Sequence, residues 1–159
     1  MSRTRRVVAL AIALAFVAVS GLAACEPQEA DGSVGAKREL AVSTAKQQLG
    51  KPYQYGAAGP GSYDCSGLTS YAWKAAGITL PRSSSAQYGG TTRITKAQLQ
   101  PGDLIFYSAS GSASSITHVA MFIGNGKLIQ ARKTGYPVEI QDVDWWSSNR
   151  VGYGRIKGV

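Results

Sequence analysis

Histidine and cysteine are scarce: the 159 residues include one histidine, His118, and two cysteines, Cys25 and Cys65. A structural zinc site typically needs about four nitrogen or sulfur ligands, so this inventory excludes one. We expect neither a metal ion nor an organic cofactor. Two cysteines are also too few for a disulfide scaffold, although an exported protein would permit a single bridge between them. Any thiol chemistry therefore depends on very few groups.

Long apolar segments are also missing. The longest apolar run covers residues 7–19, whereas a membrane-spanning helix needs about 20 residues. Arginines precede this run and the letters LAAC, ending at Cys25, follow it, which is the layout of an export signal over residues 1–24. LAAC resembles a bacterial lipobox, so we expect a lipid on Cys25 that anchors the protein to the membrane of the cell envelope. Ordinary signal-peptidase cleavage is the alternative, and it would release a secreted protein with a free Cys25 thiol.

Acidic residues are outnumbered, with nine Asp and Glu against 17 Lys and Arg, which gives a net charge of +8. Loss of the three leader arginines leaves 14 basic residues against nine acidic ones, a net charge of +5. A basic exported domain suits a polyanionic cell wall or membrane surface, although a generically basic surface would give the same count. Nucleic acid is not an expected partner, because the chain combines an export signal with no nucleic-acid-binding motif.

The chain divides into a short polar segment and one domain. Residues 25–36 are small, polar and free of aromatics, which predicts a flexible tether, and residues 37–159 form the folded domain. Apolar residues at helical spacing predict helices over residues 36–49 and 65–76, with a further helical turn near Ala86. Strands are predicted over residues 103–107, 117–123, 127–132, 138–143 and 151–157. Helices followed by an antiparallel meander indicate an α+β fold.

Cys65 is the expected nucleophile because it lies at or near the N-terminus of the second predicted helix. A thiol attacks as its thiolate, and the positive end of a helix dipole lowers the pKa of a thiol. His118 is the only imidazole that could serve as its base. The alternatives are a small buried Cys65 and a structural histidine, which are common fates of these residues.

The register of one predicted hairpin decides whether His118 has an orienting partner. A two-residue turn at Asn125-Gly126 would face Gln130 away from His118. A three-residue loop, Gly124-Asn125-Gly126, would place Gln130 opposite Ala120 and diagonal to His118 on the same face. In that register the amide oxygen of Gln130 could accept a hydrogen bond from Nδ1–H of His118 and so orient the ring. A solvent-facing Gln130 is the alternative.

Five short segments form an ordered set along the chain. They are GKPYQYG (residues 50–56), DCSGL (64–68), LPRSS (80–84), LQPGDL (99–104), and HVA followed by GNG (118–120 and 124–126). Together they resemble the NlpC family of bacterial cell-wall cysteine endopeptidases, which are papain-like enzymes that cut peptidoglycan stem peptides. The resemblance covers residues 41–157. It implies a papain-like α+β fold, in which helices carrying the nucleophile at a helix N-terminus pack on a five- to six-stranded antiparallel sheet.

The resemblance implies three catalytic residues. Cys65 would be the nucleophile, and His118 would act as general base and then as general acid. Gln130 falls at the orienting third position, where the family often has histidine. Glutamine is less basic than histidine, and it can stabilise an imidazolium only as a dipole.

The resemblance also implies substrate-binding residues. Tyr53 matches a tyrosine that would help to hold the oxyanion beside the backbone N–H of the nucleophile. Asp64 and Ser66 match positions that recognise the free amine of the stem peptide. Arg82 and Ser83 match a motif beside the cleft, and they could support the site or contact the substrate.

The expected reaction is acyl transfer by a thiolate, as in a D,L-endopeptidase that cuts the γ-D-glutamyl–diamino acid bond of a stem peptide. We expect the protein to act as a monomer. Two alternatives remain on the same fold. One is a non-catalytic wall-binding lipoprotein, and the other is an amidase or acyltransferase of the papain type.

Overall fold

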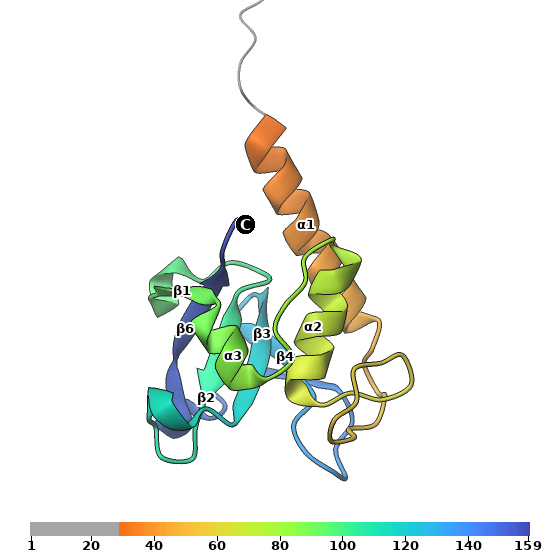
Figure 1. Cartoon of the computed structure of the whole chain (residues 1–159), viewed down its shortest axis with the longest axis vertical. Helices are drawn as coiled ribbons and strands as arrows, with labels where there is room; N and C mark the ends of the chain where they lie inside the picture. The colour runs from red at the N-terminus through yellow and green to blue at the C-terminus, as the bar shows by residue number, and fades with distance from the viewer. Residues whose placement is uncertain (1–28) are drawn as a thin grey trace, which may run out of the picture.

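The computed structural model describes residues 29–159, with side chains described from residue 33 onward. The expected export signal and Cys25 lie outside these residues. Within them the chain forms three α-helices and six strands, and the strands meet in one antiparallel sheet (Figure 1). This confirms the α+β fold. None of the helices in the described part has the length and apolar content needed to cross a membrane.

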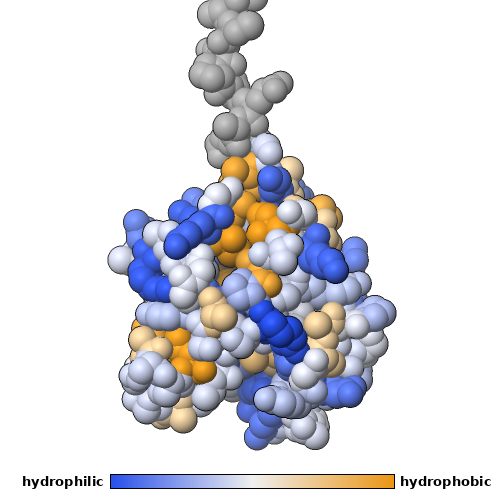
Figure 2. Space-filling view, viewed as in Figure 1, coloured by the Kyte–Doolittle hydropathy of each residue, from blue (hydrophilic) through white to orange (hydrophobic). Residues whose placement is uncertain are grey.

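Helices α1 (Glu29–Lys46) and α2 (Cys65–Ala75) lie side by side and cover one face of the sheet (Figure 1). α1 begins before the expected start at Ala36, so residues 29–36 of the expected tether are helical. That stretch contains no proline that would end the helix, although its two glycines are poor helix formers. Figure 2 shows apolar side chains gathered at the α1 end of this view, with a mixed surface elsewhere.

The helical turn expected near Ala86 is α3 (Ser84–Gly89). Its N-cap is Ser83, whose hydroxyl accepts a hydrogen bond from the backbone N–H of Ala86 at 3.2 Å. Three single-turn 3₁₀ helices complete the helical structure of the described residues, at Lys96–Gln98, Ala113–Ser115 and Ser147–Asn149.

The strands are β1 (Thr91–Ile94), β2 (Leu104–Tyr107), β3 (His118–Gly124), β4 (Lys127–Gln130), β5 (Glu139–Asp142) and β6 (Arg150–Ile156). Their order in the sheet is β1-β6-β2-β3-β4-β5. Strands β2 to β5 form the expected meander, but β6 returns to pair with both β1 and β2. Strand β1 was not predicted, because its four residues at the sheet edge show no apolar alternation.

Each face of the sheet carries its own apolar cluster. The face toward α1 and α2 buries Leu104, Phe106, Val119, Met121 and Ile129 together with Trp73 of α2. The opposite face buries Ile105, Tyr107, Ala120, Phe122 and Leu128 beneath the half-buried Trp146. The central strands are therefore covered on both sides, which fixes their register strongly.

A buried carboxylate joins α1, β2 and β6. The side chain of Asp103 is fully buried and accepts hydrogen bonds from Arg38 Nη1 at 3.0 Å and from Arg155 Nη2 at 2.8 Å. The backbone N–H of Gln100 donates to the same carboxylate at 2.8 Å. Because a buried charge is costly unless paired, these contacts hold the start of β2 in place.

Candidate active site

The DCSG segment builds the start of α2. Asp64 is the N-cap, and its Oδ1 accepts a hydrogen bond from the backbone N–H of Gly67 at 2.7 Å. Cys65 is the first residue of the helix. Glycine is required at position 67, because a Cβ there would lie 2.1 Å from the carbonyl oxygen of Ala57. The segment therefore places the Cys65 thiol at the end of α2 that faces β3.

The thiol of Cys65 is free and mostly buried. Burial raises its pKa above the ordinary value, and the neighbouring Asp64 carboxylate raises it further. Hydrogen bonds from Val119 and Ser66 oppose this shift but do not overcome it. The expectation of a lowered pKa for this thiol is therefore wrong in direction, because desolvation and the charge of Asp64 outweigh the hydrogen bonds that lower it.

His118 opens β3 and is 5% exposed. The backbone N–H of the next residue, Val119, contributes a hydrogen bond at Cys65, so the start of β3 and the start of α2 lie together. The hairpin after β3 pairs Met121 with Ile129, as the three-residue loop requires. That register is confirmed, with the irregularity at Gly124 expected for such a loop.

His118 and Gln130 form the hydrogen bond that this register predicts, but at a different ring nitrogen. Gln130 Oε1 lies 2.8 Å from Nε2 of His118, not from Nδ1. The other end of the amide, Gln130 Nε2, donates to Oε1 of Glu139 at 3.3 Å. Because a carboxylate only accepts hydrogen bonds, Glu139 fixes the amide so that its oxygen faces the ring. Nε2 of His118 must then carry the proton, which leaves Nδ1 free to accept one.

The imidazole of His118 is neutral at pH 7. Burial lowers its pKa to about 4, and the positive charge of Arg132 adds to this effect. The hydrogen bond to Gln130 acts in the opposite direction but is weaker than desolvation. Because the pKa of Cys65 is raised, the thiol and the imidazole both rest in their neutral forms.

Two cavities meet at Cys65. The first, of about 600 Å³, is lined by Tyr53, Asp64, Ser66, Arg82 and Ser83, together with other residues. The second, of about 420 Å³, is lined by His118, Arg132, Lys133, Trp145 and Trp146. Cys65, Tyr53 and Thr117 line both. Within residues 33–159 no group of three His, Cys, Asp or Glu side chains lies together as metal ligands would.

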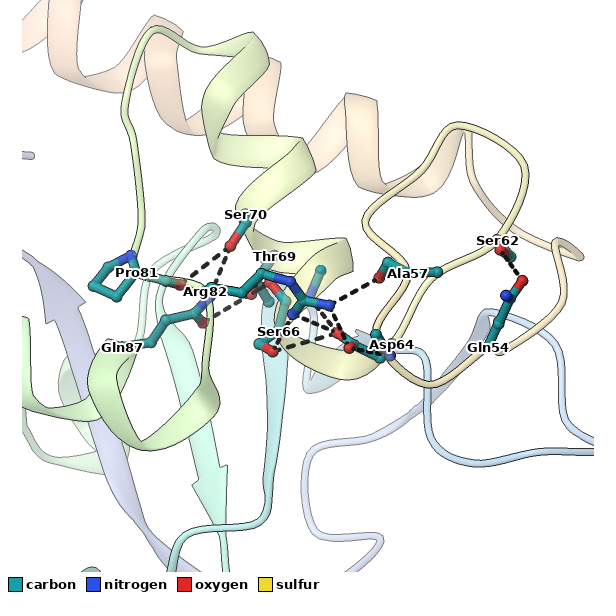
Figure 3. Close-up of polar contacts among 12 residues, drawn as sticks. Gln54, Ala57, Ser62, Asp64, Ser66, Thr69, Ser70, Pro81, Arg82 and Gln87 are labelled. Atoms are coloured by element: carbon teal, nitrogen blue, oxygen red, sulfur yellow. Dashed lines mark hydrogen bonds and ion pairs between the residues drawn. The ribbon is translucent and has the colours of Figure 1, made fainter.

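The first cavity contains an ion pair that the sequence did not predict (Figure 3). Arg82 donates to both carboxylate oxygens of Asp64, at 2.9 Å and 2.5 Å, and to Ser66 Oγ at 3.0 Å. Asp64 Oδ2 also accepts a hydrogen bond from the backbone N–H of Gly56 at 2.9 Å. The Asp64 carboxylate therefore binds three parts of the site: the loop at Gly56, the first turn of α2 and the side chain of Arg82.

Gln87 of α3 forms a separate set of polar contacts near Ser66 and Arg82, which Figure 3 draws. It is 1% exposed, and its amide joins α3 to α2 through Thr69 Oγ1 at 2.8 Å and the carbonyl oxygen of Ser66 at 3.1 Å. It also donates to the carbonyl oxygen of Pro81, beside Arg82, at 2.9 Å. A buried glutamine in a polar segment gives no sequence signal, because its partners become visible only in the fold.

Seven of the eight residues predicted for the site line the two cavities, and the eighth, Gln130, lies behind His118. The wall on the side of the second cavity was not predicted from the sequence. Arg132, Trp145 and Trp146 were not assigned to the site, nor was Glu139 behind Gln130. Glu139 lies after the connection from β4 to β5, and Trp145 and Trp146 lie in the turn after β5, where the length of the connection does not reveal which face the chain returns to. Arg132, by contrast, directly follows β4, two residues after Gln130. The side chain of Trp146 stacks on Tyr107 with ring centroids 5.6 Å apart, and it lies 6.4 Å from the His118 ring.

Comparison with known families matches residues 50–155 to the model of the NlpC/P60 family. The chain belongs to the NlpC/P60 family. A relative named probable endopeptidase p60 from Listeria monocytogenes is 43% identical over 115 residues, which cover 72% of this chain and 23% of that protein. The bifunctional muramidase/DL-endopeptidase CwlT of Bacillus subtilis is 34% identical, over 75% of this chain and 36% of its own length.

The NlpC/P60 relatives differ in the bond that their names report. The murein DD-endopeptidase MepH of Escherichia coli is 36% identical over 74% of this chain and 45% of its own length. Among solved structures, an NlpC/P60 family protein from Bacillus cereus superposes with a TM-score of 0.71 at 34% identity, over 74% of this chain and 39% of that one. The chain thus spans less than half the length of each of these proteins.

Proposed function

We propose that the protein is a cysteine endopeptidase that hydrolyses the stem peptides of peptidoglycan. One observation carries the proposal: a free thiol at a helix start and an imidazole held by Gln130 line the same cavity. The names of the relatives, which report endopeptidase and murein endopeptidase activity, support the substrate class.

The reaction begins with proton transfer from Sγ of Cys65 to Nδ1 of His118. The thiolate attacks the carbonyl carbon of the peptide bond, and the amine leaves with the proton returned by His118. Water, deprotonated by the same nitrogen, then hydrolyses the thioester and regenerates the thiol. Gln130 holds the proton on Nε2 throughout, so that Nδ1 remains the working nitrogen.

Stabilisation of the tetrahedral oxyanion falls to Tyr53 and the backbone N–H of Cys65. Tyr53 lines both cavities together with Cys65. Burial raises the pKa of its phenol, and a thiolate at Cys65 and the Asp64 carboxylate raise it further. The phenol therefore stays protonated and can donate a hydrogen bond to the developing negative charge.

The first cavity would bind the amine end of the stem peptide. Asp64 supplies the negative charge and Ser66 a hydroxyl, while Arg82 and Ser83 close the wall. The Asp64 carboxylate already accepts five hydrogen bonds, so it enters the reaction in a fixed position. A preorganised carboxylate suits recognition of one ammonium group, here the free amine of the stem peptide. For the bond that is cut, we propose the γ-D-glutamyl–diamino acid bond.

Purified sacculi test the proposal. Wild-type protein should release soluble muropeptides, and the matched variants Cys65→Ala and His118→Ala should release none above background. The variant Lys157→Gln, at an exposed site far along the chain, serves as the control and should match wild type. Release by Cys65→Ala equal to wild type would overturn the proposal, and release of glycan-free whole stems would point to an amidase.

We also propose that residues 1–24 are removed and that Cys25 is lipidated, with the protein acting as a monomer at the cell envelope. The LAAC sequence supports lipidation. Cys25→Ser should move the protein from the membrane fraction to the medium. If Cys25→Ser protein stayed in the membrane fraction, the lipid anchor would be rejected. Light scattering of the soluble variant tests the monomer, and a mass twice that of the chain would reject it.

A further inference from the structure

The second cavity is cationic. Two basic side chains, Arg132 and Lys133, line it together with Trp145 and Trp146, and no described acidic side chain does. By contrast, the first cavity holds Asp64 paired with Arg82. The two sides of the cleft therefore differ in charge. On the side of the first cavity the charges of Asp64 and Arg82 offset each other, and on the side of the second cavity the charge is positive.

The guanidinium of Arg132 is held in place by aromatic rings, and its Nε has no hydrogen-bond partner among the described residues. Its side chain is 22% exposed, and its guanidinium carbon lies 3.9 Å from the ring centroid of Tyr136 and 5.2 Å from that of Trp145. Its buried Nε has no hydrogen-bond partner among the described residues, and Glu139 Oε1 lies 3.5 Å away. A guanidinium oriented by aromatic rings offers parallel N–H donors that match a carboxylate.

Lys133 adds a second positive charge at the cavity rim. Its Nζ lies 5.1 Å from the ring centroid of Tyr136, and it forms no ion pair with a described residue. The neighbouring Glu139 faces Gln130 and Arg132 Nε from behind the site and does not line the cavity. A ligand in the cavity therefore meets net positive charge.

The position of His118 indicates which side of the cleft receives the leaving amine. In the proposed reaction this ring returns a proton to the departing amine, and His118 lines only the second cavity. The residue whose amine leaves must therefore occupy the second cavity, while the acyl half occupies the first. This assignment rests on the proposed function.

We propose that the second cavity is a subsite for a leaving residue whose side chain ends in a free carboxylate. Arg132 and Lys133 would bind that carboxylate, and Trp145 and Trp146 would contact the apolar part of the side chain. A diamino acid with a second carboxyl group fits this chemistry. The same residue with an amidated carboxyl group, or a lysine in its place, brings no negative charge and fits it poorly.

A matched peptide pair tests the subsite by binding. The peptides are L-alanyl-γ-D-glutamyl-meso-diaminopimelate with its main-chain carboxyl amidated, and the same peptide with the side-chain carboxyl amidated as well. Titration calorimetry with Cys65→Ala protein measures both dissociation constants without turnover. The free-carboxylate peptide should bind about tenfold more tightly, the effect of one charge-assisted hydrogen bond at a partly exposed site.

Substitutions then locate the effect. Each substitution is made in the Cys65→Ala protein. The ratio of the two dissociation constants should fall from about ten toward one in Lys133→Gln and in Arg132→Gln, whereas Arg132→Lys should keep part of the preference. Lys157→Gln is the exposed lysine control and should keep all of it. Lys133 is exposed, so its substitution should leave the fold intact even if Arg132→Gln does not.

Equal affinity for the two peptides, or a preference unchanged in both Arg132→Gln and Lys133→Gln, would overturn the subsite. Cleavage assays with wild-type protein separate this failure from failure of the proposed function. A retained binding preference without cleavage of either peptide would reject the endopeptidase and keep the carboxylate site. Cleavage of both peptides at equal rate, with equal binding, would keep the endopeptidase and reject the site.

Discussion

The amide oxygen of Gln130 lies 2.8 Å from Nε2 of His118, in a pair that is buried on both sides. Glu139 fixes the orientation of that amide from the next strand, where the register places it directly opposite Gln130. The three side chains thus form a row across β3, β4 and β5. In this row Nε2 of His118 carries the proton, so Nδ1 is the nitrogen that can act as the base. No charged side chain bonds to the ring itself.

The first prediction concerns this row. Gln130→Ala should lower kcat by about 10- to 100-fold, because His118 loses the acceptor that fixes its tautomer. Glu139→Gln should lower kcat by about tenfold, since the Gln130 amide could then present either end to the ring. Nitrogen-15 NMR of His118 should show a single Nε2–H tautomer in wild type and a mixture in Glu139→Gln. The control Gln141→Ala, on the same strand, should change neither; a wild-type tautomer in Glu139→Gln would reject the role of Glu139.

The second prediction concerns the reactivity of Cys65. The raised pKa of the thiol and the lowered pKa of His118 mean that little thiolate exists at pH 7. In Cys25→Ser protein, the alkylation rate with iodoacetamide should rise about tenfold per pH unit from pH 6 to 8. The urea-unfolded protein, in which the thiol has an ordinary pKa, should react faster at pH 7. A fast plateau extending down to pH 5 would instead reveal a thiolate–imidazolium pair.

The third prediction concerns acid stability. The native pKa of His118 is about 4 against an ordinary 6.5, so the unfolded chain binds more protons between these values and stability rises with pH there. As the pH falls from 7 to 4, this group alone should remove about 3 kcal/mol from the unfolding free energy. Urea titrations of wild type and His118→Asn at several pH values measure it, because all other titrating groups cancel in the difference. Parallel pH dependences of the two proteins would contradict the lowered pKa.

The fourth prediction concerns the buried carboxylate. Asp103→Ala should lower the unfolding free energy by roughly 3–5 kcal/mol, because Arg38 and Arg155 lose their shared partner. Asp142→Ala removes an exposed partner of Lys127 and should cost less than about 1 kcal/mol. Denaturant titrations compare the two. Equal costs would show that Asp103 is not the anchor that joins α1 to the sheet.

The local signals of the sequence predicted much of the site. DCSG predicted a helix start at or near Cys65, and GNG offered the three-residue loop as one of two possible turns, because both features depend on residues close together in the chain. With that loop, the alternation of the strands puts His118 and Gln130 on one face, as the structure shows. The choice between Nδ1 and Nε2 was wrong, since ring orientation depends on packing around the start of β3.

Non-local features could not be predicted in this way. Glu139 meets Gln130 only because the connection between β4 and β5 returns in one particular register, and β6 returns to lie between β1 and β2. The direction of the Cys65 pKa shift depends on how much protein surrounds the thiol, which one sequence does not reveal. Arg82 likewise met Asp64 through a fold that brings α3 against α2.

The most direct measurement of the central claim is mass spectrometry of the muropeptides released from sacculi by wild type and by Cys65→Ala. Wild type should produce fragments that end in D-glutamate, paired with fragments that carry a new free amine on the diamino acid, and Cys65→Ala should produce neither. Fragments cut at this bond by Cys65→Ala, or sacculi left intact by the wild type, would contradict hydrolysis through Cys65.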